Sequence, residues 1–178
     1  MHELGRMTPV EFATAPKIPL IVVLDNIRSG NNVGSVFRTS DAFRLEEVIL
    51  GGITVKPPHR DIMKTALGAD EHVAWSHYED LLPILHNLKS KGYKIASVEQ
   101  VENSVSLEKW SPAADEKWCV VMGNEVAGVS DEVVSISDIC IEVPQFGSKH
   151  SLNIAVCTGM VFWQYMVQSG FKQLAPRQ

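Results

Sequence analysis

The sequence predicts an α/β fold in which helices cover both faces of a mostly parallel sheet. Short continuous apolar runs, such as PLIVVLD at 19–25 and WCVVMG at 118–123, are typical of parallel strands buried on both faces. These runs alternate with segments of helical periodicity, which is the pattern of strand–helix–strand units. The 178 residues, 45% hydrophobic and 21% charged, suffice for one globular domain with a substantial core.

The first expected helix, at 32–44, carries two residues that the helix itself does not require. Its apolar side chains recur at helical spacing, so one face is buried, and Asn31 or Asn32 is expected to cap the first turn. Gly34 costs roughly 0.5–1 kcal/mol against alanine, which indicates close approach of another backbone or a ligand. Arg38 lies beside the buried face, where the helix dipole gives a cation no advantage. These residues fit either tight packing with a solvated arginine or a functional site.

The rest of the chain continues the alternation of strands and helices. Further strands are expected at 46–52, 93–99, 118–123 and 139–143, and further helices near 61–67, at 80–92 and at 151–169. Parallel sheets place ligands beyond the carboxyl ends of their strands, so polar segments that follow strands are candidate binding loops. Three such segments are DNIRSGNNVGSVFR, VVMGNEVAGVS and IEVPQFGSKHSLNIAV.

Composition narrows the functional classes. Three cysteines without a CxxC pair argue against a disulfide framework or a zinc knuckle, and favour a reducing, cytoplasmic setting. The first 17 residues lack the apolar core of a signal peptide, and the apolar stretch at 154–163 is too short for a membrane span, so we expect no membrane partner. The net charge of −5 counts mildly against nucleic-acid binding, but both ends of the chain are weakly basic around an acidic middle.

Signatures of several other α/β proteins are missing from the sequence. It contains no GxGxxG after the first strand, no GxxxxGK[ST] and no GxSxG, which argues against the common nucleotide-binding and hydrolase sites. His72 and His77 are not four residues apart and have no matching carboxylate or cysteine, so no metal is expected. The segments 122–130 and 143–153 instead place glycines beside polar residues, where backbone groups could bind a flat heterocycle.

Three segments, taken together and in order, resemble the motifs of a known family. NNVGSVFRTSDAF, MGNEVAGVS and VPQFGSKHSLNIAV look like the three motifs of the SPOUT superfamily, specifically of the TrmH-type RNA 2′-O-ribose methyltransferases. The resemblance extends from about Leu20 to Gln168. At two positions the sequence differs from the family: Gln145 stands where methionine is frequent, and Ala155 where serine is frequent. These differences affect the expected pocket for the substrate base more than the expected catalysis.

The resemblance implies a fold and an activity. It implies a C-terminal deep trefoil knot that binds S-adenosylmethionine, and transfer of its methyl group to a ribose of RNA, with tRNA favoured because no separate RNA-binding domain is visible. It also implies a homodimer that joins through its first and last helices, in agreement with the apolar residues on more than one face of the last helix. The expected divisions are a leader at 1–18, the methyltransferase domain at 19–170 and a tail at 171–178.

By the same resemblance, individual residues receive roles. Arg38 is the catalytic arginine, near the ribose and a phosphate, either as the base or as a guanidinium that polarises the hydroxyl while phosphate or water takes the proton. Asn32 and Glu125 would order the pocket, and Ser151 and Asn153 would hold the RNA phosphate, Arg38 and the cofactor loop. Backbone groups would bind the cofactor, together with Ser151, near Val98, Gly123, Val143 and Leu152.

Other readings remain open. The RNA could be rRNA instead of tRNA. A knotted RNA-binding or assembly protein without activity would be expected to lack Arg38 or Asn153, and both are present. A small-molecule-binding α/β protein is a third class, which a calorimetric screen of cofactors would separate from the first.

Overall fold

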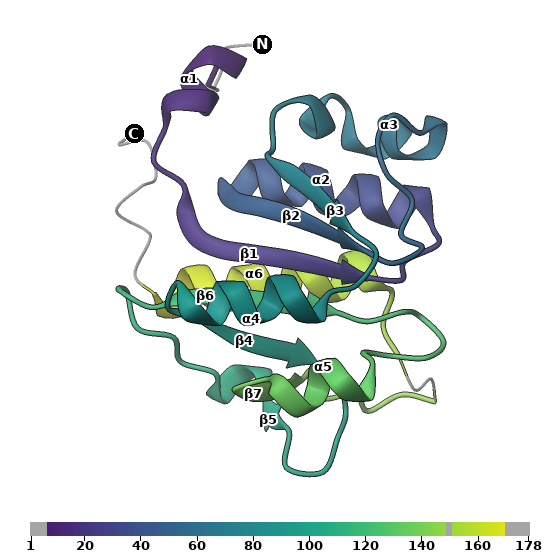
Figure 1. Ribbon diagram of the computed structural model, residues 1–178, viewed down its shortest axis with the longest axis vertical. Coiled ribbons are helices and arrows are strands. Elements are labelled where there is room, and N and C mark those ends of the chain that lie inside the picture. The colour runs from purple at the N-terminus through teal and green to yellow at the C-terminus, as the bar shows by residue number, and fades with distance from the viewer. Residues whose placement is uncertain (1–6, 149–150, 170–178) are drawn as a thin grey trace.

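A seven-stranded, parallel sheet forms the centre of the molecule (Figure 1). The computed structural model describes residues 7–148 and 151–169. Its strands lie in the order β3-β2-β1-β6-β4-β7-β5, and each recorded pair of neighbouring strands is parallel. The strands are β1 (Ile18–Asp25), β2 (Leu45–Gly51), β3 (Trp75–Tyr78), β4 (Tyr93–Val98), β5 (Val105–Ser106), β6 (Lys117–Met122) and β7 (Ile139–Glu142). The predicted α/β class with a parallel sheet is confirmed.

Helices cover both faces of this sheet, and each face has its own apolar cluster. The helices are α1 (Pro9–Thr14), α2 (Gly30–Phe43), α3 (Arg60–Ala66), α4 (Leu82–Ser90), α5 (Asp131–Ile136) and α6 (Ile154–Gln168), with short 3₁₀ turns η1 (Ala69–Glu71) and η2 (Leu107–Lys109). Successive side chains of β1 point to opposite faces of the sheet and so belong to different clusters. Leu20 and Val22 pack with α2, α3 and α6, whereas Ile21 and Val23 pack with α4 and α5.

Two helix caps differ from the sequence-based expectation. Ser29 caps α2, since its Oγ accepts a hydrogen bond from Asn32 N at 3.3 Å, so the helix starts earlier than expected and neither asparagine is the cap. Asn153 caps α6 through hydrogen bonds from Ala155 N and Val156 N, and this helix starts after the expected Ser151. In both cases another residue of a type favoured at helix starts lies two or three positions away along the chain, which is why pattern alone misplaced the start.

Several short elements were missed. The strand β3 has partly exposed residues at an edge of the sheet, β5 has two residues, and α5 has six, so each is too short or too exposed to repeat an apolar pattern several times. Within the expected leader, α1 begins with a capping box in which Thr8 and Glu11 bond each other's backbone. The expected tail at 171–178 lies outside the described residues.

The close approach predicted at Gly34 is confirmed. A Cβ atom placed there would lie 2.2 Å from Thr65 Oγ1 and 2.3 Å from the carbonyl oxygen of Ile62. Thr65 Oγ1 also donates a hydrogen bond of 2.9 Å to Asn31 O. The helix α3 therefore packs directly on the first half of α2, and a glycine is needed at the crossing. Within the described ranges, no helix combines the length and apolar character needed to span a bilayer.

Candidate functional site

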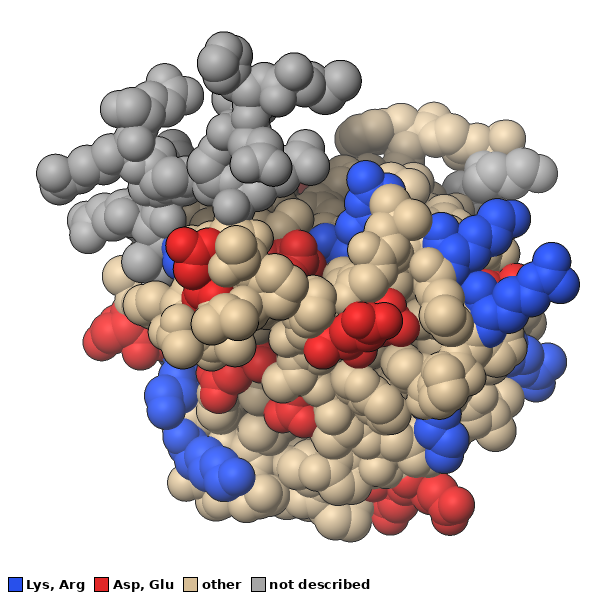
Figure 2. Space-filling view, turned by 90° about the horizontal axis from the view of Figure 1, so that it is seen from above, with Lys and Arg blue, Asp and Glu red and all other residues tan. Residues whose placement is uncertain are grey.

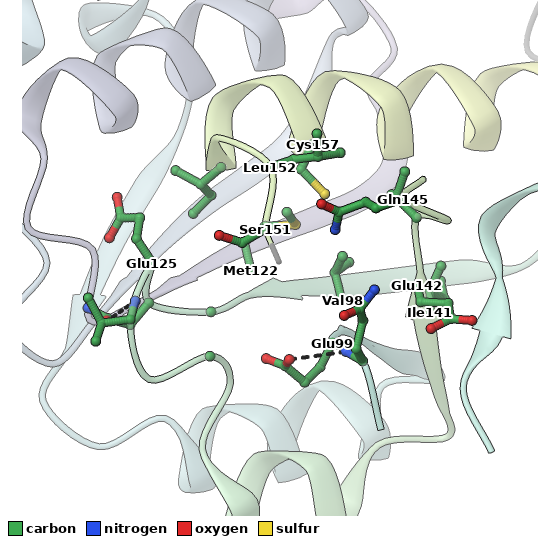
Figure 3. Close-up of a pocket in the computed structure, with 17 residues that line it drawn as sticks. Val98, Glu99, Met122, Glu125, Ile141, Glu142, Gln145, Ser151, Leu152 and Cys157 are labelled. Carbon is green, nitrogen blue, oxygen red and sulfur yellow. Dashed lines mark hydrogen bonds between the residues drawn. The ribbon is translucent and has the colours of Figure 1, made fainter. Parts of the chain in front are cut away.

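A pocket of about 380 Å³ lies beyond the carboxyl ends of β4, β6 and β7 and beside the start of α6. Its walls come from the end of β4, from both glycine-bearing loops and from the first residues of the last helix. All five residues predicted to bind the cofactor line it: Val98, Gly123, Val143, Ser151 and Leu152. Figure 3 shows Ser151 and Leu152 on one side of the pocket and Val98 on the other. The two loops thus face one cavity, as the sequence predicted.

The loop after β6 is tight because two glycines allow its backbone segments to touch. Asn124 and Gly128 exchange two backbone hydrogen bonds, of 3.0 and 2.9 Å. A Cβ atom at Gly123 would lie 2.3 Å from the carbonyl carbon of Gly128, and Gly128 itself has φ +72°. Asn124 Oδ1 also accepts hydrogen bonds from two backbone amides of the loop, Val126 N and Ala127 N. The loop therefore has a fixed shape with Glu125 at its exposed turn.

Glu99 is a pocket residue that sequence reasoning missed. Its Oε2 accepts a hydrogen bond of 2.9 Å from Val129 N, and its Oε1 accepts one of 3.0 Å from Gln100 N. It follows β4 directly, at the carboxyl edge where the other binding loops begin, and this position was the available signal. Glu99 therefore ties the end of β4 to the loop after β6 while it lines the pocket.

Three residues from the three sequence motifs meet in one hydrogen-bonded chain. Asn153 Nδ2 donates to Asn32 Oδ1 at 3.1 Å, and Asn32 Nδ2 donates to Glu125 Oε1 at 2.9 Å. Asn153 Oδ1 caps α6, which fixes the orientation of the Asn153 side-chain amide. The Asn153 NH₂ group therefore faces Asn32 Oδ1, and the NH₂ group of Asn32 faces the carboxylate of Glu125. The chain joins the starts of α2 and α6 to the loop after β6, across 121 residues of sequence.

Arg38 lies apart from this chain. Its side chain is exposed on α2 and makes no hydrogen bond or ion pair with any described residue. It does not line the pocket, and neither do Asn32 and Asn153, whereas Glu125 and Ser151 do. The predicted catalytic residues therefore fall into two groups: Glu125 and Ser151 at the pocket wall, and Asn32, Asn153 and Arg38 on the adjoining surface.

The charged side chains of the pocket wall are three carboxylates, Glu99, Glu125 and Glu142, and its described lining residues include no lysine or arginine. Burial raises the pKa of the Cys157 thiol to about 11, so this group is neutral at physiological pH. Met122, Ile141 and Leu152 add apolar surface. Among the described residues, no cluster of three or more histidine, cysteine or acidic side chains could hold a metal ion. The arrangement suits an organic ligand with an apolar part and a planar part that bonds to backbone groups.

Residues 19–163 match the family model described as the SpoU rRNA Methylase family. The chain is 26% identical over 149 residues to the tRNA (guanosine(18)-2′-O)-methyltransferase of Borreliella burgdorferi, covering 84% of this chain and 66% of the relative. It is 28% identical over 157 residues to the 23S rRNA (guanosine(2553)-2′-O)-methyltransferase of Bacillus subtilis, covering 88% of this chain and 60% of the relative. The chain thus spans less than two thirds of the length of either enzyme.

Solved structures share the fold. The A. aeolicus TrmH/SpoU tRNA modifying enzyme superposes with a TM-score of 0.82 at 25% identity, over 93% of this chain and 83% of that chain. The AdoMet-bound rRNA methyltransferase from Sinorhizobium meliloti superposes with a TM-score of 0.75 at 24% identity, over 91% of this chain and 61% of that chain.

Proposed function

Because this chain belongs to the SpoU rRNA Methylase family, we propose that it is an S-adenosylmethionine-dependent RNA 2′-O-ribose methyltransferase. The observation that carries this proposal is the hydrogen-bonded chain Asn153–Asn32–Glu125, which brings all three motifs together beside a pocket lined by backbone, apolar and carboxylate groups. tRNA is the favoured substrate, since the A. aeolicus tRNA modifying enzyme shares the fold over 93% of this chain at 25% identity. rRNA is the alternative.

The residues of the pocket fit the cofactor. Backbone groups near Gly123, Val143 and Leu152, which line the pocket, would bond the adenine and the methionine part, and the neutral Cys157 thiol would add no charge there. The cofactor would supply an electrophilic methyl group. We further propose that the segment from β7 into α6 forms the trefoil knot around this pocket. The three free cysteines suit a reducing cytoplasm, where we place the protein.

In this proposal Arg38 acts on the RNA and not on the fold. A ribose hydroxyl becomes a nucleophile when its proton leaves during the transfer. An arginine guanidinium carries its positive charge throughout the physiological pH range. The guanidinium of Arg38 would therefore bond the 2′ oxygen and a neighbouring phosphate, stabilise the developing negative charge, and leave the proton to phosphate or water.

We expect the protein to bind S-adenosylmethionine and S-adenosylhomocysteine in the presence of a metal chelator. The pocket offers backbone donors and acceptors for both, and its described residues include no metal-binding cluster. Isothermal titration calorimetry with each compound measures this, with adenosine triphosphate as a comparison ligand that lacks the methionine part. Absence of heat with both cofactor forms would contradict the assignment and favour another small-molecule or RNA-binding class. Mapping of ribose methylation in RNA from a deletion strain then identifies the nucleotide.

We expect a homodimer that uses the exposed side of α6. Val156, Met160 and Trp163 recur every three to four residues and are 56%, 41% and 60% exposed, opposite the buried residues of the same helix. Trp163 also contacts Phe43 at the end of α2, with ring centroids 6.5 Å apart. An apolar stripe that spans two helices is typical of an interface.

Light scattering at micromolar concentration should give about twice the 19.7 kDa chain mass. The Trp163→Glu variant should shift the protein towards the monomer, whereas Val10→Glu, at an apolar side chain that is 76% exposed on α1, should not. A wild-type monomer at this concentration, or equal effects of both variants, would contradict this interface.

A further inference from the structure

Positive side chains gather where α2 and α3 pack together. We call this region the α2–α3 seam and define it by the segments 26–40 and 52–66. It contains five cations and a single carboxylate, Asp61, although the chain as a whole has a net charge of −5. All five cations are exposed: Arg28, Arg38, Lys56, Arg60 and Lys64.

Contacts along the seam hold its two segments side by side. Ile27 N donates to Thr54 Oγ1 at 2.9 Å, and Val55 N donates to Ile27 O at 3.3 Å. The loop that carries Arg28 is therefore paired with the loop that carries Lys56. Further along, Gly30 lies against His59, which caps α3 through a hydrogen bond from Asp61 N to its Nδ1.

The helical positions bring the remaining cations to the same region. Arg38 follows Gly34 by four residues, and Gly34 contacts α3, so Arg38 projects from the α3 side of α2. Arg60 and Lys64 are also four residues apart and share one exposed side of α3. Figure 2 shows blue side chains gathered on the side of the molecule where Figure 1 places α3.

No partner within the described chain neutralises these cations. The ion pairs among the described residues are Lys89–Asp138 and Lys94–Glu116, and both lie on other elements. Unpaired cations on one surface raise the electrostatic potential there and attract a polyanion. The rest of the surface is rich in acidic residues, with thirteen acidic against five basic residues in 65–140, so a polyanion is directed to the seam.

We propose that the α2–α3 seam binds phosphates of the substrate RNA on one side of the reacting nucleotide, through Arg28, Lys56, Arg60 and Lys64. This rests on the proposed function, since it extends the RNA from Arg38 across α3. Contacts to phosphates are independent of base sequence and fix the position of the strand. The seam therefore determines how RNA approaches Arg38, and the pocket residues determine cofactor binding.

The test compares two double variants with the same change in net charge. Arg60→Ala/Lys64→Ala removes two seam cations, and Lys91→Ala/Lys109→Ala removes two exposed cations outside the seam, one directly after α4 and one in η2. Fluorescence anisotropy measures the binding of labelled, unfractionated tRNA without cofactor over a range of salt concentrations. We expect the seam variant to bind at least about tenfold more weakly near 0.1 M salt. The plot of log affinity against log salt concentration should become shallower by about 1.4–1.8, because two phosphate contacts are lost and each contributes about 0.7–0.9 to the slope.

The control variant should keep both the wild-type affinity and slope. In turnover, the seam variant should show a raised KM for RNA at an unchanged kcat, and calorimetry should give the wild-type affinity for S-adenosylmethionine. Equal salt slopes for the two double variants, or no RNA binding by the wild type, would overturn the proposal. Failure of the proposed function is distinguished by the wild type binding RNA normally while it binds no cofactor.

Discussion

Replacement of Arg38 by alanine should lower the rate of RNA methylation by about a hundredfold or more, with little change in cofactor affinity or Tm. The side chain is exposed and has no partner among the described residues, so its removal leaves no core cavity. Loss of a contact made to developing charge in the transition state costs about 3 kcal/mol or more. Single-turnover transfer of a labelled methyl group at saturating cofactor and RNA measures this effect.

Arg38→Lys should not restore the activity. A planar guanidinium can bond a ribose oxygen and a phosphate at the same time in fixed geometry, and an ammonium group cannot. The neighbouring Phe37 provides the contrast, because it is fully buried in the core beneath α2. Phe37→Ala should cost about 3–5 kcal/mol of unfolding free energy. If either Arg38 variant methylated bulk RNA at close to the wild-type rate, or if Arg38→Ala lowered Tm as Phe37→Ala does, the arginine would not have its assigned role.

The larger elements could be predicted because each shows its full period in the sequence. The run at 18–25 is apolar on both faces, and α2 has a continuous buried stripe, so both were found within two residues. The elements β3, β5 and α5 are stabilised by the sheet and helices around them, and their own sequences are too short or too polar to specify them.

The residues of the site were found unevenly, for a related reason. A strand end followed by glycines and polar residues indicates a binding loop, which is why the five residues predicted to bind the cofactor line one pocket. Asn32 bonds Glu125 and Asn153, which lie 93 and 121 residues away in the sequence. These contacts depend on the order of the strands in the sheet, and local sequence patterns do not specify that order. Glu99 was missed because a single carboxylate after a strand resembles a solvated residue until the loop beside it is placed.

Gly34→Ala should destabilise the protein strongly, although alanine is the better helix former. The added Cβ atom would meet Ile62 O at 2.3 Å, and a backbone carbonyl within α3 cannot move aside as a flexible side chain could. We expect a loss of about 3 kcal/mol, at the upper end for overpacking, which lowers Tm by roughly 6–12 °C for a chain of this size.

Gly159→Ala in α6 is the matched control, because a Cβ atom there has no heavy atom of the same chain within 4 Å. Gly159 lies three residues from Val156 and four from Trp163 on the proposed interface, so both glycine variants are compared in the Trp163→Glu background. Gly159→Ala should leave Tm unchanged or raise it slightly, since alanine gains about 0.5–1 kcal/mol over glycine inside a helix. Differential scanning calorimetry of both variants under identical conditions measures the difference. Because Thr65 bonds Asn31 at the same crossing, separation of α3 from α2 should also weaken RNA binding more than cofactor binding. Equal Tm values for the two variants would mean that α3 does not pack on α2 at Gly34, and that the seam lacks the fixed geometry on which RNA positioning depends.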